Sequence, residues 1–141
     1  MERWGRLMWR LGSGLWLGSI FFLFVAIAPN VFRVLPESDA GRLVDAIFPV
    51  YYAMGLALGG LLLLGSVLRM RVQTGVRSWI PTIVGIINLL LVWWADRILA
   101  AMQKMSAGSA VFHAMHQRSV AISAVVFVVM LFGVVYEAVA V

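Results

Sequence analysis

The two histidines, His113 and His116, are the side chains best suited to metal binding or proton transfer. Their spacing on a helix places the imidazoles about 60° apart, so both can face the same partner helices. Asp96 is a third candidate ligand, and zinc or copper accepts such a set of nitrogen and oxygen donors. A metal site of His113, His116 and Asp96 is one hypothesis, although its spacing is less specific than that of a longer helical zinc motif.

Other cofactors and reaction classes fit the sequence less well. Two histidines on one helix face cannot occupy opposite axial positions, which argues against a bis-histidine haem. The chain has no cysteine, and it contains no serine-histidine-acid triad, phosphate-binding loop or nucleotide fingerprint. An enzyme that uses His116 and Asp96 as acid and base is therefore the least favoured class.

The composition indicates the kind of structure that positions these groups. Of 141 residues, 63% are hydrophobic and 12% are charged, and the mean hydropathy is +0.99. These values are typical of an integral membrane protein surrounded by the lipid bilayer. The formal charge of +5 comes from scattered basic residues rather than a dense cluster, which argues against a nucleic-acid partner.

Four stretches are long enough to cross a hydrocarbon core of about 30 Å, which takes about 20 helical residues. They are residues 11–31, 46–68, 79–101 and 119–136, the last within a helix expected over 109–136. Helices are favoured over a barrel because the sequence lacks strict alternation of apolar and polar residues. We predict an all-α integral membrane four-helix bundle, with one domain over residues 1–141.

The basic residues near the membrane ends indicate the orientation. With the N-terminus inside, the inner set is Arg3, Arg6, Arg10, Arg69, Arg71 and Arg77, and the outer set is Arg33, Arg42, Arg97, Lys104 and Arg118. We expect a multi-pass protein with both termini in the cytoplasm. The first apolar run is longer than that of a typical secretory leader, and cleavage after its A-x-A pattern would leave Pro29 first, so a retained helix is expected.

Local patterns add expectations about packing. The G-x-x-x-G motifs at residues 14–18 and 55–59 predict close packing of the first helix on the second, with homodimerisation as the alternative. Residues 38–48 predict a short amphipathic segment in the outer interface, and Pro49 predicts a kink after it. Asn88 lies deep in the third span, where a hydrogen bond between helices is expected.

Polar side chains from four helices are expected at one depth, near the outer ends. The predicted ligand-binding set is Arg33, Tyr51, Tyr52, Asp96, His116 and Ser119. Such a set can form a hydrated pocket open outward, while the inner half of the bundle is nearly all hydrophobic. Each member also has a structural explanation: the tyrosines can anchor the interface, and Asp96 can pair with a nearby arginine.

Four short motifs follow one another along the chain: Pro29-x-x-Phe32-Arg33-x-Leu35-Pro36, Ala40-Gly41-Arg42, Phe48-Pro49-x-Tyr51-Tyr52 and Phe112-x-x-x-His116-x-x-Ser119. Their order resembles the transmembrane protein 205-like family, a small four-helix membrane domain of largely unknown function. The resemblance covers nearly the whole chain. It implies that Arg33, residues 48–52, His116 and Ser119 are family features, and it implies no reaction.

The favoured function is binding of a small ligand or metal ion in the outer pocket, with a role related to transport. The alternative is a non-catalytic accessory subunit that packs against a larger membrane complex through its glycine faces, or forms a homo-oligomer. These alternatives predict different results for His116→Ala. The substitution should abolish ligand binding if the pocket is used, and it should have no effect on an accessory subunit.

Overall fold

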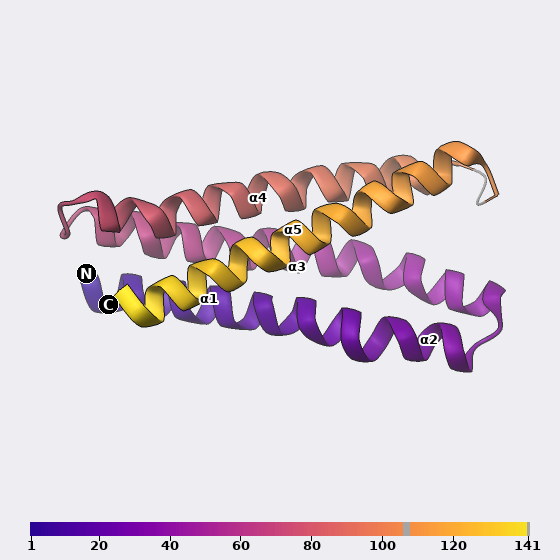
Figure 1. Ribbon diagram of the computed structural model, residues 1–141, viewed down its shortest axis with the longest axis horizontal. Coiled ribbons are helices and arrows are strands. Elements are labelled where there is room, and N and C mark those ends of the chain that lie inside the picture. The colour runs from indigo at the N-terminus through magenta and orange to yellow at the C-terminus, as the bar shows by residue number, and fades with distance from the viewer. Residues whose placement is uncertain (106–107, 141) are drawn as a thin grey trace.

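All regular elements of the computed structural model, which describes residues 1–105 and 108–140, are helices. The first long helix consists of α1 (Glu2–Phe22), a π-helical turn (Leu23–Ile27) and α2 (Ala28–Val34), and it is followed by α3 (Glu37–Met70), α4 (Val76–Met102) and α5 (Ala110–Ala140) (Figure 1). Four helices are thus long and apolar enough to cross a membrane. The predicted all-α four-helix bundle is confirmed, and the chain has the character of a multi-pass membrane protein.

The helices extend beyond the spans expected from hydropathy. The first begins at Glu2 rather than near residue 11, so its first turns carry arginines that hydropathy leaves outside the span. The expected separate segment over residues 38–48 is instead continuous with the second span, in the single helix α3. Pro49 lies inside α3 without ending it. A proline removes only one backbone donor, and packed neighbours in a membrane protein can compensate for that loss.

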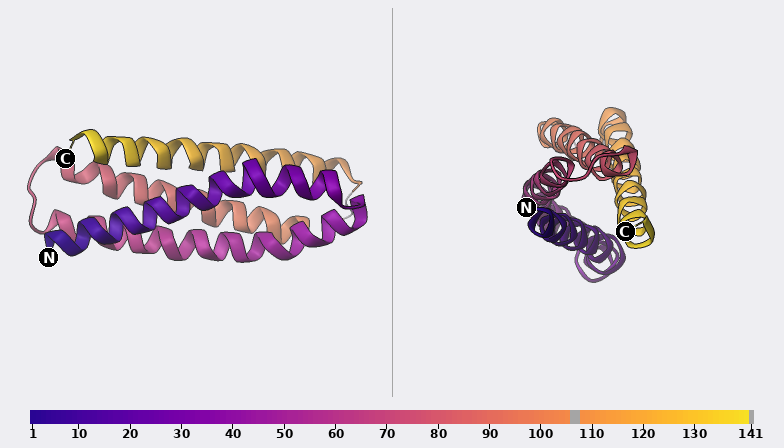
Figure 2. Two further views of the ribbon diagram at one scale, coloured as in Figure 1. Left: turned by 90° about the horizontal axis from the view of Figure 1, so that it is seen from below. Right: turned by 90° about the vertical axis from the view of Figure 1, so that its left-hand side faces the viewer.

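The helices form a ring in the order α1, α3, α4, α5, as the end-on view in Figure 2 shows. Each helix packs on its two neighbours in this ring, and the α1–α5 contact is the least extensive. Both chain ends and the α3–α4 connection lie at one end of the bundle, here called the termini end (Figure 1). The α2–α3 and α4–α5 connections lie at the opposite end, here called the far end.

Glycines at the termini end allow α1 and α3 to touch backbone to backbone. A Cβ atom on Gly65 would lie 2.6 Å from the Gly5 carbonyl oxygen, and one on Gly12 would lie 2.9 Å from the Leu58 carbonyl oxygen. The predicted packing of these two helices is therefore correct, but its glycines differ in part. Of the predicted α3 pair, Gly55 faces Trp16 of α1, whereas Gly59 faces Asn88 of α4. Gly14 and Gly18 are exposed, and a Cβ atom on either would have no described residue within 4 Å.

Hydrogen bonds join helices that lie diagonally across the ring. Between α1 and α4, the Trp16 indole Nε1 donates to the Asn88 side-chain oxygen at 2.9 Å, in the middle of the core. This contact confirms the interhelical hydrogen bond expected for Asn88. The other diagonal, α3 to α5, is joined by side chains at both ends of the bundle, and these two contacts define the candidate sites.

Candidate functional site

A buried ion pair lies at the termini end of the bundle. Arg69 Nη1 donates to Glu137 Oε1 at 2.7 Å, and only 4% and 5% of the two side chains are exposed. Burial removes both charges from water, so the pair persists only because each charge compensates the other. Ionisable side chains that a membrane bundle encloses are costly and mark candidate functional sites.

Local structure explains why these residues need each other. Arg69 lies in the last turn of α3, where the partial negative charge of the helix end favours a cation. Glu137 lies near the C-terminal end of α5, where the same effect disfavours a carboxylate. Arg69 therefore offsets an unfavourable position of Glu137. Its side chain reaches across because Gly5 leaves room: a Cβ atom there would lie 2.8 Å from Arg69 Cγ.

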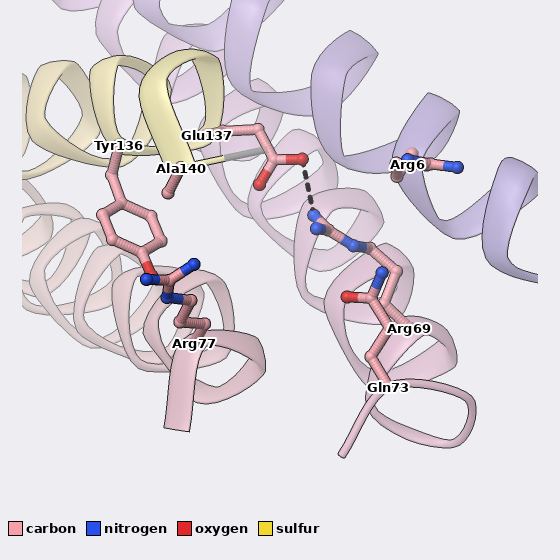
Figure 3. A pocket seen from close by; sticks show the side chains of 7 residues that line it. All are labelled: Arg6, Arg69, Gln73, Arg77, Tyr136, Glu137 and Ala140. Atoms are coloured by element: carbon pink, nitrogen blue, oxygen red, sulfur yellow. Dashed lines mark hydrogen bonds and ion pairs between the residues drawn. The ribbon is translucent and has the colours of Figure 1, made fainter. Parts of the chain in front are cut away.

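A cavity of about 320 Å³ adjoins this ion pair. All four helices contribute to its lining, which consists of Arg6, Arg69, Gln73, Arg77, Tyr136, Glu137 and Ala140. In Figure 3, Arg69 and Glu137 point toward each other, with Arg77 on one side and Arg6 on the other. Three guanidinium groups thus surround the cavity against one carboxylate, and this balance favours an anionic ligand.

A smaller polar network borders the cavity on the α1 side. Glu2 Oε1 accepts a hydrogen bond from Gln73 Nε2 at 2.8 Å and lies 3.2 Å from Arg6 Nη2. These contacts tie the start of α1 to the end of α3. The Arg6–Glu2 pair is one-third exposed, so it positions the arginine more than it stabilises the fold.

One buried atom of the ion pair lacks a partner. Glu137 Oε2 accepts no hydrogen bond from any residue that the structure describes. The residue is 4% exposed, so bulk water does not readily satisfy this oxygen. Buried polar atoms are nearly always paired in folded proteins, and an exception at a cavity indicates a group that a bound molecule can satisfy.

At the far end, the structure brings together part of the predicted site. The hydroxyl groups of Tyr52 and Ser119 lie 3.2 Å apart and join α3 to α5. Asp96 of α4 is partly buried. Tyr51 packs against the Trp16 ring, with centroids 4.9 Å apart, so it belongs to the core.

The other predicted residues point away from this cluster. Arg33 is exposed and donates to Asn30 of its own helix at 2.7 Å, and His113 and His116 are both exposed. Asp96 forms no ion pair with any described residue. Across residues 1–105 and 108–140, no three histidine, aspartate or glutamate side chains are grouped to hold a metal ion. The zinc or copper hypothesis therefore has no geometric support in this part of the chain.

The cavity at the termini end was not expected from the sequence. Arg69, Arg71 and Arg77 were interpreted as topology signals, and Glu137 lies one residue beyond the expected end of the last span. The available signal was an isolated acidic residue beside a long apolar run. The expectation that this half of the bundle is nearly all hydrophobic is wrong at its end.

The fold and the buried charges define a class: small integral membrane proteins built as a four-helix bundle. Residues 11–107 match the family described as a domain of unknown function (DUF4149), and the chain belongs to this family. The matched range includes three residues of the cavity, namely Arg69, Gln73 and Arg77. It does not include Arg6 or Glu137, so the start of α1 and the end of α5 complete the cavity from outside the match.

An uncharacterised protein of Aquifex aeolicus (strain VF5) is similar to part of this chain. The two are 45% identical over 45 residues, which make up 32% of this chain and 33% of that protein. The chain thus matches about a third of its relative's length. No solved structure matches. These findings agree with a small membrane domain of unknown function, and the finer relationship to the transmembrane protein 205-like family remains a prediction.

Proposed function

We propose that this chain is a membrane-embedded binding protein whose ligand carries a phosphate or a similar anionic group, held at the termini end. The observation that carries the proposal is the cavity of about 320 Å³, whose lining holds three arginines and one carboxylate. Arg69 is already paired with Glu137. Arg6 lies 3.2 Å from Glu2. Arg77, which has no ion-pair partner among the described residues, therefore supplies the positive charge that the ligand would neutralise, with Arg6 beside it.

The depth of the cavity favours a ligand at the membrane surface. The helices contain 27 to 34 residues, and at about 1.5 Å per residue they are about 40 to 50 Å long. The hydrocarbon core is only about 30 Å thick, so the helix ends reach the headgroup region. Arg69 is one residue from the end of α3 and Glu137 three from the end of α5. Both positions support a cavity at the depth of lipid phosphates.

The chemistry of the lining suits phosphate recognition. A guanidinium group presents planar N–H donors that match two phosphate oxygens at once. The Tyr136 hydroxyl on α5 and the Gln73 amide in the α3–α4 connection add neutral donors. A cavity of this size is at the lower end of ordinary ligand sites, about 300 to 1,000 Å³, so it suits a small ligand or the headgroup of a larger one.

This proposal keeps the binding function expected from the sequence and moves it to the opposite end of the bundle. The positive residues of the 69–77 region support a cytoplasmic location for the termini end. The order of the short motifs supports a relationship to the transmembrane protein 205-like family. Tyr52 and Ser119, which both belong to those motifs, would then contribute to helix packing at the far end.

Native mass spectrometry with added lipid tests the proposal. We expect purified protein to retain phosphatidylglycerol but not diacylglycerol with the same acyl chains. Arg77→Gln should weaken phosphatidylglycerol binding about tenfold, because a charge-assisted hydrogen bond contributes about 1.5 to 3 kcal/mol. Arg71→Gln is the matched control, since it removes the same charge at the same end without lining the cavity. Equal binding by both variants would refute the proposal.

An accessory role is the second candidate, favoured by the open G-x-x-x-G face of α1. Gly14 and Gly18 are exposed and could admit another helix at close range. The test is the mass of the particle in mild detergent, for wild type and for the Gly14→Leu, Gly18→Leu double variant. A larger assembly that the double variant loses would support this role, and a monomer in both cases would exclude it.

A further inference from the structure

The unpaired oxygen of Glu137 narrows the ligand class beyond an anion. Glu137 Oε1 accepts from Arg69 at 2.7 Å, whereas Oε2 has no hydrogen-bond partner among the described residues. In Figure 3 this second oxygen points away from the Arg69 hydrogen bond, to the side on which Tyr136, Ala140 and Arg77 are drawn. An anion bound to the arginines would leave Oε2 unsatisfied and would be repelled by it.

A simple cation could pair with Glu137 Oε2, but the cavity does not favour it either. Arg6, Arg69 and Arg77 all line the same cavity, and together they disfavour a free metal or ammonium ion. A molecule that carries both charges satisfies both requirements: its anionic group can approach the arginines while its cationic group donates to Oε2. Glu137 pairs with Arg69 and Glu2 pairs with Arg6, so the charge of Arg77 remains in excess and favours an anionic group on the ligand.

We infer that the ligand is an aminoalkyl phosphate, a phosphate joined by a short chain to a primary ammonium group, as in the phosphatidylethanolamine headgroup. The inference rests on the proposed phosphate-binding function. Arg77 and Arg6 hold the phosphate, and Glu137 Oε2 accepts a hydrogen bond from the ammonium group. The 320 Å³ cavity admits the headgroup, and the acyl chains of a lipid remain in the bilayer.

The carboxylate favours a primary amine over a quaternary one. A primary ammonium has three N–H donors and can form a short charge-assisted hydrogen bond to a carboxylate oxygen. A trimethylammonium group has no donor, so it leaves Oε2 without a hydrogen bond. Glu137 is only 4% exposed, so bulk water does not readily replace the missing donor.

A methylation series on the wild-type protein tests the inference without any substitution. Phosphatidylethanolamine, its N-methyl and N,N-dimethyl forms and phosphatidylcholine, all with the same acyl chains, are compared by native mass spectrometry. We expect affinity to fall along the series by about tenfold in total, the loss of one charge-assisted hydrogen bond. Equal affinity along the series would overturn the inference even though phosphate binding remained.

Glu137→Gln tests the role assigned to the carboxylate. The amide oxygen can still accept from Arg69, but the second position becomes an N–H₂ donor that repels an ammonium group. The variant should lose the preference for phosphatidylethanolamine over phosphatidylcholine. Glu37→Gln, an exposed change at the far end, should keep the preference. A preference that survives in a folded Glu137→Gln protein would overturn the assignment of Oε2.

Soluble phosphoethanolamine distinguishes a free metabolite from a lipid headgroup. Displacement of bound phosphatidylethanolamine by an excess of the soluble compound would support recognition through the headgroup alone. Lack of displacement, together with a preserved methylation trend, would support recognition of the intact lipid. If no phosphate-bearing probe binds in a way that depends on Arg77, both this inference and the proposed function fail. If phosphatidylglycerol and phosphatidylcholine bind as well as phosphatidylethanolamine, only this inference fails.

Discussion

Replacing the buried ion pair gives the clearest prediction about stability. Arg69→Met or Glu137→Leu alone leaves one charge buried without its partner, because both side chains are at least 95% enclosed. Removal of one member of a buried pair costs about 3 to 5 kcal/mol. We expect about 3 kcal/mol for each single variant, since the cavity beside the pair lets water reach the remaining charge in part.

The double variant should behave differently from the sum of its parts. Independent effects would add to about 6 kcal/mol, but apolar replacement of a whole buried pair is often neutral or stabilising. We therefore expect Arg69→Met, Glu137→Leu to unfold within about 1 kcal/mol of wild type. This variant should also lose the preference for phosphatidylethanolamine over phosphatidylcholine, which would separate the function of the pair from its effect on stability.

Equilibrium unfolding in mixed micelles, with increasing sodium dodecyl sulfate and far-UV circular dichroism, measures these differences. Arg71→Met is a suitable control, because Arg71 is exposed at the same end of the bundle. Single variants that lose less than about 1 kcal/mol would show that the pair is hydrated rather than buried. A double variant that loses the full sum would show that the two residues act independently.

Three further predictions concern packing and the metal hypothesis. Gly65→Ala should destabilise the bundle by about 1 to 3 kcal/mol, because its Cβ would lie 2.6 Å from a backbone oxygen of α1. The control is Gly14→Ala, at an open helix position, which should be neutral or slightly stabilising in the same unfolding assay. Asn88→Ala should cost about 1 to 3 kcal/mol by leaving the buried Trp16 indole N–H without an acceptor, and a smaller loss would mean that water replaces the amide. His116→Ala should leave the free energy of unfolding and the metal content unchanged, since this imidazole is exposed. If elemental analysis found a stoichiometric metal that the variant loses, the metal-site hypothesis would be supported again.

The fold was predictable because hydropathy and helix length depend on local sequence. Four apolar runs, each long enough to cross the bilayer, allow few arrangements other than a helical bundle. The interhelical role of Asn88 was also accessible, because an amide deep in an apolar span needs a partner. Packing details were less accessible, since a G-x-x-x-G motif does not say which face of the helix turns inward. Gly5 and Gly65 therefore meet, whereas Gly14 faces outward.

The far-end site was only partly predictable for a related reason. The inward face of α5 passes through Phe112, Met115, Ser119 and Ile122, and these residues follow the three- to four-residue spacing of a helix. Ser119 reaches Tyr52 from this face. His116 is about 100° around the helix from Met115, so it points away from the bundle although it lies at a suitable depth. Depth can be estimated from hydropathy, but rotation depends on contacts between helices.

The site at the termini end was not predictable from one span at a time. A charge at the end of a span is usually hydrated, and neither Arg69 nor Glu137 differs locally from an ordinary interfacial residue. Their burial results from the meeting of several helices, including the close approach that Gly5 allows. Only the assembled bundle distinguishes these two charges from the others at that end.

The diagonal hydrogen bonds have a mechanical consequence for the whole bundle. Four helices that contact only their neighbours in the ring can shift from a square to a rhombic cross-section without losing any of those contacts. Contacts across the diagonals oppose this shear. The Trp16–Asn88 hydrogen bond joins α1 to α4, and the Tyr52–Ser119 and Arg69–Glu137 contacts join α3 to α5 near the two ends of the bundle. A change in the tension or thickness of the bilayer would then shear the bundle first where the contact between diagonal helices is weakest.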